Sequence, residues 1–276
     1  MTEKTKETLE KLKEGIKNIM ESEKYMEFLK TMSKFHNYSF NNMILIHIQR
    51  PDATYVAGFK DWLTKFRRLV KKGEKGITII APIPYIRKEK NEKGEEIETK
   101  GLTYKATHVF DISQTQGEDL PTMETEELKG KVKNFNTLKG AIEELSSIKI
   151  EYRNLENDTK GFYSEKQNLI VIKNGMSEIQ TLKTLLHELA HSQAHCKLAI
   201  SERKQRVTRS AMESEAESIA YVVSDYFGID TSDYSFIYIA GWLSESTYEE
   251  FLESMKIIQK VSDDIIKTIK EKLQNA

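Results

Sequence analysis

The most constraining feature of this sequence is an apolar stretch, residues 181–191, that ends in the pattern His-Glu-x-x-His. Leucines recur in it at helical spacing and give a helix a buried face: Leu182, Leu185, Leu186 and Leu189. His187 and His191 are four residues apart, so a helix presents both imidazoles to one metal ion. Glu188 can then hold and deprotonate a metal-bound water. An ionised carboxylate in an apolar helix is costly without a partner, which favours a metal site over a chance spacing of histidines.

The metal expected here is Zn2+, because zinc accepts imidazole nitrogen and keeps a coordination position open for water in catalytic sites. A third ligand is available downstream, where Glu213, Glu215 and Glu217 crowd one stretch of a second predicted helix. We expect Glu213 to be the ligand and Glu217 to accept a histidine N–H beside it. The reverse assignment stays open, since helix phase does not separate residues four apart. Glu215 points elsewhere, and we expect it to face solvent.

Other polar side chains near the pattern are weaker candidates. His195 lies one turn beyond His191, too far along a straight helix to share the metal. We expect it at the surface or supporting a ligand from behind, with Cys196 as a half-buried thiol. Tyr221 and His195 are candidates for stabilising an oxyanion.

Composition narrows the class of protein. The 276 residues are enough for two domains, and a net charge of -1 excludes a globally basic nucleic-acid binder while leaving room for a local basic patch. The single cysteine fits a reducing compartment. The charged start of the chain has no signal-peptide pattern, and no apolar run is long enough to span a membrane. These features predict a cytoplasmic protein without membrane contact.

Periodicity predicts an α+β fold in two parts. Residues 1–120 form an α/β domain, 121–135 a linker and 136–276 a mostly helical domain with a small sheet. The first part is expected to contain helical stretches at 2–33 and 58–66, an apolar run at 43–49, a buried strand at 77–82 and a long hairpin formed by 85–87 and 104–110. The second part is expected to contain helices at 138–145, 208–227, 235–243 and 249–273, a strand at 148–152, a hairpin at 161–172 and a metal-binding helix capped by Ser177 with Gln180.

A basic stretch in the first part is interleaved with aromatic residues. Its cations outnumber Asp61 and Glu74, and its aromatics are Tyr55, Phe59, Trp62 and Phe66. Cations that follow phosphates beside aromatic faces are typical of single-strand binding. The plainer interpretation is a packed aromatic core beside a solvated charged face. The candidate nucleic-acid contacts are Tyr38, Asn41, Asn42, Lys60, Trp62, Arg67, Arg68, Lys71, Lys72 and Lys75.

Several longer motifs resemble those of the ArdC-type antirestriction proteins carried by conjugative elements. In the first part they are residues 38–42, 49–54, 56–59, 71–77, 80–82 and 109–115. In the second part, residues 187–191 and 213–217 look like the zincin domain of that family, which is also similar to the ImmA/IrrE metallopeptidases. The residues after His191 look more like the ImmA/IrrE proteins.

The resemblance implies a single-stranded-DNA-binding domain followed by a zinc metallopeptidase-like domain, in a protein that shields incoming DNA of a mobile element from restriction. A protein substrate, either a repressor or a restriction component, is the second expected partner. Two alternatives stay open. One is an ImmA/IrrE-like metallopeptidase regulator that cleaves a repressor. The other is a DNA-protecting binder with a non-catalytic zinc site, although the presence of Glu188 argues against it. The oligomeric state is left open.

Overall fold

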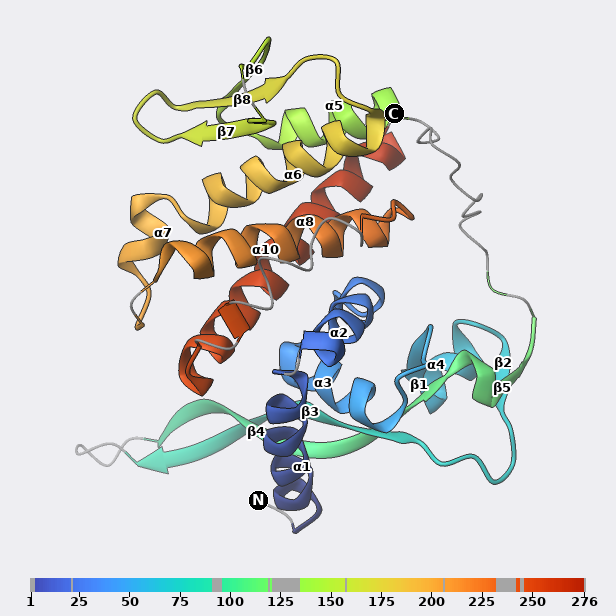
Figure 1. Cartoon of the computed structure of the whole chain (residues 1–276). Helices are drawn as coiled ribbons and strands as arrows, with labels where there is room; N and C mark the ends of the chain where they lie inside the picture. Colours follow the sequence, from blue (N-terminus) through green and yellow to red (C-terminus); the bar gives the residue numbers. More distant parts are fainter. Residues whose placement is uncertain are drawn as a thin grey trace. The chain divides into compact units, whose positions relative to one another are not determined.

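The structure is a computed structural model that describes residues 3–20, 22–90, 96–118, 120, 135–156, 158–205, 207–231, 242–243 and 246–275. The chain divides into two compact units, which Figure 1 shows in sequence colours. The first unit consists of residues 1–18 and 41–121, and the second of residues 19–40 and 122–276. Both contain helices and sheet, which confirms the predicted α+β class.

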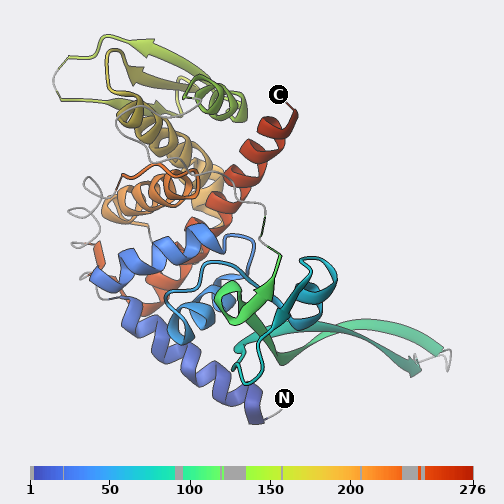
Figure 2. The ribbon, with the colours of Figure 1, turned by 90° about the vertical axis from the view of Figure 1, so that its right-hand side faces the viewer.

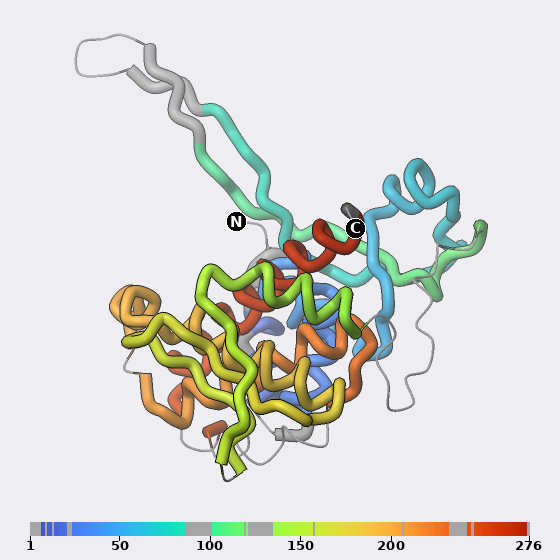
Figure 3. Tube along the Cα trace, turned by 90° about the horizontal axis from the view of Figure 1, so that it is seen from above, coloured from blue at the N-terminus to red at the C-terminus, as the bar shows by residue number. Residues whose placement is uncertain are grey.

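The first unit is built on an antiparallel sheet with the strand order β1-β4-β3. Its elements are α1 (Glu3–Ile19), α3 (Phe40–Gln49), β1 (Val56–Gly58), α4 (Phe59–Thr64), β2 (Arg68–Val70), β3 (Ile77–Lys90), β4 (Glu96–Asp111), the 3-10 turn η1 (Ile112–Gln114) and β5 (Thr115–Gly117). Strands β3 and β4 pair from Ile77 with Val109 outwards, forming the long hairpin that Figure 3 shows as an extended arm. The predicted hairpin is therefore confirmed.

Helix α3 covers the open edge of β3 with two amide side chains. Asn42 bonds both the N–H and the carbonyl of Ile80, each at 2.9 Å. Gln49 does the same at Thr78, also at 2.9 Å. The two amides are seven residues apart and so lie two turns apart on one helix face. They satisfy backbone groups that an unpaired edge strand would otherwise expose.

The second unit places a small sheet over a set of helices, as Figure 2 shows. Its elements are α2 (Ser22–Lys34), α5 (Phe135–Leu145), β6 (Lys149–Arg153), β7 (Gly161–Ser164), β8 (Leu169–Lys173), α6 (Glu178–Ala194), α7 (Lys197–Ser201), α8 (Arg209–Tyr226) and α10 (Tyr248–Asn275). The strand order is β6-β8-β7, with β6 parallel and β7 antiparallel to β8. Helix α6 packs against this sheet and against α8, which packs against α10.

The main elements predicted for the second part are confirmed: helices at 138–145, 208–227 and 249–273, the hairpin at 161–172 and the edge strand at 148–152. The predicted helix at 235–243 lies outside the described residues except for its last two, which are helical, and the 121–135 linker lies outside them except for residue 135. Among the described residues, no helix is long and apolar enough to cross a membrane.

The predicted helical stretch at 2–33 is two helices that belong to different units. α1 ends at Ile19, and residues 19–40, with α2, belong to the second unit. The reason is packing: the side chain of Tyr25 is fully buried, and its hydroxyl lies 2.8 Å from the Ser218 hydroxyl of α8. Its ring also meets those of Trp242 and Phe251 edge-on. Periodicity along a helix predicts a buried face but not which core buries it.

Candidate metal centre and nucleic-acid surface

A capping serine sets the start of helix α6, and a face of leucines determines which side of it is buried. The Ser177 side chain accepts a hydrogen bond from the Gln180 backbone N–H at 3.3 Å, which confirms the predicted cap. The four leucines of the apolar stretch are at most 1% exposed: Leu182, Leu185, Leu186 and Leu189. With these side chains in the core, His187 and His191 are left on the side that faces α8.

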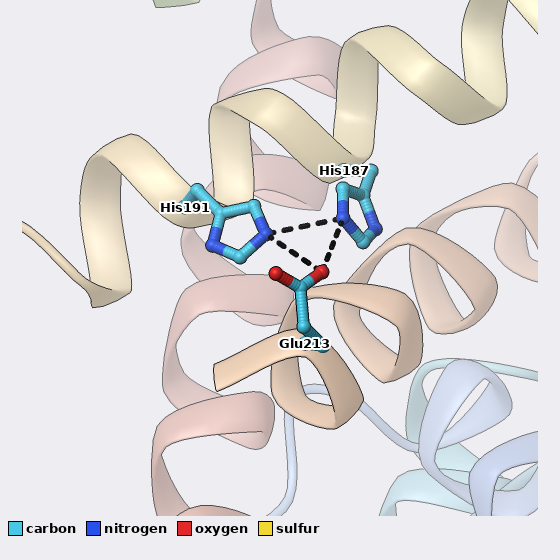
Figure 4. Close-up of side chains that lie close together, drawn as sticks. All are labelled: His187, His191 and Glu213. Atoms are coloured by element: carbon cyan, nitrogen blue, oxygen red, sulfur yellow. Dashed lines mark hydrogen bonds and ion pairs between the residues drawn. The ribbon is translucent and has the colours of Figure 1, made fainter. Parts of the chain in front are cut away.

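Helix α8 brings the carboxylate that completes the cluster. Thr208 caps this helix by accepting from Ala211 N–H at 3.1 Å, which places Glu213 in its second turn. Glu213 Oε2 lies 3.4 Å from His187 Nε2 and 3.5 Å from His191 Nε2. The two Nε2 atoms are 3.1 Å apart. Ligand atoms of the three side chains thus lie within 4.8 Å of one another, and all three converge on one point in Figure 4.

The donor set fits a divalent cation. Two imidazole nitrogens and one carboxylate oxygen are ligands that zinc accepts, with one position left over for water. Burial by itself lowers the pKa of His187, but its hydrogen bonds to Glu213 and Glu217 raise it to about 9. Hydrogen bonds from His187 and His191 hold the pKa of Glu213 well below its usual range. A bound cation would replace the proton in the hydrogen bond between His187 Nε2 and Glu213, because the cation and the proton use the same lone pairs.

Glu217 meets the opposite nitrogen of His187. Its Oε2 lies 3.2 Å from His187 Nδ1, and its other oxygen forms an ion pair with Lys183. Both partners of that pair are 9% exposed at the side chain. Burial alone would raise the pKa of Glu217, but His187 and Lys183 lower it. This geometry supports Glu213 as a ligand and Glu217 as the group that orients His187.

Glu188 lies beside the cluster at the wall of a pocket. It is 7% exposed, and burial raises the pKa of its carboxyl group, with His187 and His191 acting in the opposite direction. The backbone N–H of Tyr163, in β7, donates to this carboxyl group. The pocket has a volume of about 320 Å³ and is lined by residues 158–161, Gln180, Lys183, Thr184, His187, Glu188 and Glu217. A carboxylate with a raised pKa at the edge of a pocket is suited to accept and return a proton.

The expectation that Glu215 faces solvent is wrong. Its side chain is completely buried and forms a bidentate pair with Arg203, with one oxygen 2.9 Å from Arg203 Nη1. It also accepts from Ser254 Oγ at 2.5 Å and meets His195 Nε2 at 2.9 Å. The physical reason is that α8 is packed against α2, α6 and α10, so a side chain pointing away from the metal enters the core. Sequence reasoning missed Arg203 and Ser254; the signal for them was a glutamate in a mostly buried helix, which needs partners.

His195 is buried behind the metal cluster, with only 3% of its side chain exposed. Its Nδ1 lies 2.9 Å from Nδ1 of His191. It is therefore not a surface histidine, and its contact with His191 is consistent with the other option that the sequence left open, a group behind a candidate ligand. Tyr221 is 1% exposed, and burial together with Asp225 and Asp230 raises its pKa. Cys196 is half-buried, as predicted.

Several candidate nucleic-acid contacts turn out to be structural. Trp62 is fully buried and donates from Nε1 to the Phe110 carbonyl at 2.8 Å. Arg68 is 9% exposed, and its guanidinium bonds Thr115 together with the backbone carbonyls of residues 115, 117 and 118. Asn42 is also 9% exposed and forms the clamp on β3. Trp62 therefore has no exposed surface to offer a base, and Arg68 and Asn42 have little. Tyr38 is half-buried in the second unit, where its ring meets Phe35.

The remaining candidates are exposed in the first unit: Asn41, Lys60, Arg67, Lys71, Lys72 and Lys75. Within the stretch where aromatics and cations interleave, Tyr55 and Phe59 were not among the candidates but are also exposed, at 43% and 56%. Tyr55 leans edge-on against Trp62, and Phe59 against Phe110. Their interleaving with cations was visible in the sequence, but periodicity did not show which ring of the series turns outwards. We call Tyr55, Phe59, Lys60, Arg67, Lys71, Lys72 and Lys75 the basic-aromatic surface.

Comparisons with known proteins match the N-terminal and the C-terminal part of the sequence separately. A family model for the N-terminal domain of the anti-restriction factor ArdC matches residues 1–110, and one for the IrrE N-terminal-like domain, a peptidase family, matches residues 143–242. A Bacillus anthracis protein named pXO2-81 is 30% identical over 318 aligned positions, which cover 98% of this chain and 52% of the relative. The chain thus spans about half the length of that relative.

Two solved structures share the fold. Both are crystal structures of the antirestriction ArdC protein from the R388 plasmid, and each is 18% identical to this chain. The metal-free form aligns with a TM-score of 0.54 over 86% of both chains. The Mn(II)-bound form aligns with a TM-score of 0.57 over 94% of this chain and 97% of that one.

Fold and sequence together define a chain whose second unit contains a metallopeptidase-like domain, with a cluster of metal-ligand type between two of its helices. The matched domains are an ArdC N-terminal domain followed by an IrrE-like domain. These two domain matches in this order, together with the shared fold, make the chain similar to the ArdC-type antirestriction proteins.

Proposed function

We propose that this chain is an antirestriction-type protein of a mobile element that acts in the cytoplasm, binds single-stranded DNA and carries a zinc-dependent peptidase site. The observation that carries the peptidase part is the cluster of His187, His191 and Glu213, within 4.8 Å, with the buried Glu188 next to it. The family match to an IrrE-like peptidase domain supports the same conclusion.

The side chains around the site orient the metal-binding histidines and transfer protons. A zinc ion, when bound, supplies Lewis acidity and lowers the pKa of its water. Glu188 accepts the proton of the attacking water and returns it to the leaving amine, for which its raised pKa suits it. Glu217 orients His187 through Nδ1 and is itself held by Lys183. The pocket between β7 and α6 receives the substrate beside these groups.

Peptidase activity is tested with the zinc-loaded protein and its Glu188→Gln variant, which keeps the shape of the side chain but removes the base. The probe is casein, with new amino termini identified by mass spectrometry. We expect cleavage by the wild type and a loss of at least about 100-fold in the variant, since a general base contributes about 10²–10⁴-fold. Zinc binding without cleavage that depends on Glu188 would instead support a DNA-protecting binder with a non-catalytic metal site.

The DNA-binding part rests on the ArdC N-terminal domain and on the basic-aromatic surface. Exposed rings offer stacking platforms, and the neighbouring cations can follow the phosphates of a single strand. Phe59 has the greater exposure of the two aromatics and lies in α4 next to Lys60. The proposal therefore moves the stacking role from Trp62 to Phe59 and Tyr55.

Binding is tested by fluorescence anisotropy with a labelled single-stranded oligonucleotide. We expect Phe59→Ala to weaken binding by about 5–150-fold, the equivalent of about 1–3 kcal/mol for one stacked base. The double variant Lys72→Ala/Lys75→Ala should lower the slope of log K against log salt by up to about 1.4, since each phosphate contact contributes about 0.7.

The matched control is Lys166→Ala/Lys197→Ala, which removes two exposed lysines from the second unit. It should bind DNA like the wild type. If the wild type itself does not bind at low salt, the antirestriction proposal fails, and a peptidase that regulates a repressor becomes the better account.

A further inference from the structure

The two histidines of the metal cluster are supported in different ways. His187 is held through Nδ1 by the carboxylate of Glu217. His191 is held through Nδ1 by a second imidazole, that of His195, at 2.9 Å. An imidazole, unlike a carboxylate, accepts a hydrogen bond only if its own proton sits on the other nitrogen. The role of His195 therefore depends on what its Nε2 meets.

Nε2 of His195 meets a carboxylate that accepts a hydrogen bond from it. Glu215 Oε2 lies 2.9 Å away. A carboxylate only accepts, so His195 must carry its proton on Nε2 and keep a lone pair on Nδ1. That lone pair accepts Nδ1–H of His191. When His191 is neutral, as a metal-binding histidine must be, its lone pair is then on Nε2, the atom that faces Glu213 and His187.

Glu215 is held in turn by groups from two further segments. Arg203, between α7 and α8, forms a bidentate pair with it, and Ser254 of α10 donates to it at 2.5 Å. The groups that hold Glu215 are buried together with it. The side chains of His195, Glu215 and Arg203 are 3%, 0% and 5% exposed, and Ser254 is 3% exposed. Arg203 balances the charge of Glu215, so the hydrogen bond between Glu215 and His195 does not require a positive charge on His195.

We propose that His195 is a positioning residue that fixes the tautomer and ring orientation of His191, through a row of hydrogen bonds anchored by Glu215, Arg203 and Ser254. The inference rests on the proposed metal site and adds the group that prepares its second histidine. Outer partners of this kind typically contribute about 10–100-fold to metal affinity. The row also links the metal cluster to the segment before α8 and to α10.

The test compares zinc affinity, measured by competition with a chromophoric chelator, in the wild type and two variants of His195. His195→Leu removes both hydrogen bonds while keeping an apolar side chain, and we expect zinc to bind about 10–100-fold more weakly. His195→Gln keeps an oxygen that accepts and an N–H that donates. It is the matched control, and we expect it to restore affinity to within a few-fold of the wild type.

A spectroscopic measurement on the unaltered protein covers the case in which His195→Leu does not fold. In zinc-loaded, ¹⁵N-labelled wild type we expect scalar coupling across the hydrogen bond between the two Nδ1 nuclei of His191 and His195. Equal zinc affinity in folded His195→Leu, or absence of that coupling, overturns the inference while the metal site stands. If the wild type binds no zinc at all, the proposed site itself fails.

Discussion

Glu213 and Glu217 are four residues apart on one helix, yet they meet opposite nitrogens of the same imidazole. Glu213 faces Nε2 of both His187 and His191, whereas Glu217 reaches only His187, through Nδ1. Their exposures differ as well, 37% against 9% at the side chain. Two chemically identical residues can therefore have distinct roles, one as ligand and one as the orienting acceptor.

This assignment predicts unequal losses of metal affinity. Glu213→Gln removes a proposed ligand, so we expect zinc affinity to fall by more than the roughly 10–100-fold that an outer partner contributes. Glu217→Gln should lose affinity only within that range. Competition with a chromophoric chelator measures both.

A control is needed because Glu217→Gln breaks the buried ion pair with Lys183, and breaking a buried pair typically destabilises a protein by about 3–5 kcal/mol. Thermal unfolding with excess chelator separates that cost from metal binding. If Glu217→Gln, while folded, loses more affinity than Glu213→Gln, the reverse assignment is correct.

At the residue scale, the sequence was informative where spacing alone decides geometry. The interval between His187 and His191 determines that they share a helix face, and that interval needs no knowledge of the neighbours. Glu215 shows the opposite case. The sequence predicted correctly that its side chain points away from Glu213 and Glu217. The predicted exposure to solvent was wrong, because α8 is packed against three other helices. Whether a direction ends in water depends on tertiary packing, which one segment does not encode.

At the scale of elements, the close approach of β7 to α6 shapes the pocket beside Glu188. Gly161, the first residue of β7, lines that pocket. A Cβ atom at this glycine would lie 2.7 Å from Thr184 Cγ2 and 2.9 Å from the Val171 carbonyl oxygen. A backbone carbonyl in a sheet cannot move aside easily, so the position accommodates only a residue without a side chain.

We therefore predict that Gly161→Ala destabilises the protein by about 1–3 kcal/mol, the usual cost of overpacking a filled core. Urea unfolding measures the change. Gly140→Ala in α5 is the matched control, because a Cβ there meets nothing within 4 Å. That variant should stabilise by about 0.5–1 kcal/mol through helix propensity. Equal effects at both positions would contradict the packing argument.

Elements were predictable where the hydrophobic pattern is strong, as in α6, α8 and the β3–β4 hairpin, and in α6 a predicted cap agreed with the pattern. The division of 2–33 between two units was not, because a helical period shows a buried face without naming its partner. The amide clamp of α3 on β3 was hidden for a similar reason. Asn42 was predicted as a nucleic-acid contact and Gln49 ends the apolar run 43–49, and only the fold brings the edge of a strand to them.

At the scale of the whole molecule, the two proposed activities lie in different units. The basic-aromatic surface belongs to the first unit and the metal cluster to the second. Each unit has a buried tryptophan, Trp62 in the first and Trp242 in the second. Variants with a single tryptophan, made by Trp62→Phe or Trp242→Phe, therefore report on each unit separately.

We predict that metal removal affects only the second unit. A ligand that binds only the folded state stabilises it by about 2.7 kcal/mol at one hundred times its Kd. Zinc at that excess should raise the unfolding midpoint reported by Trp242, and a chelator should reverse the shift. The midpoint reported by Trp62 and the affinity for single-stranded DNA should stay unchanged, because none of the residues of the basic-aromatic surface is a proposed metal ligand. If chelation weakens DNA binding while Trp62 reports an intact first unit, the metal site controls the DNA surface and the two activities are one coupled function.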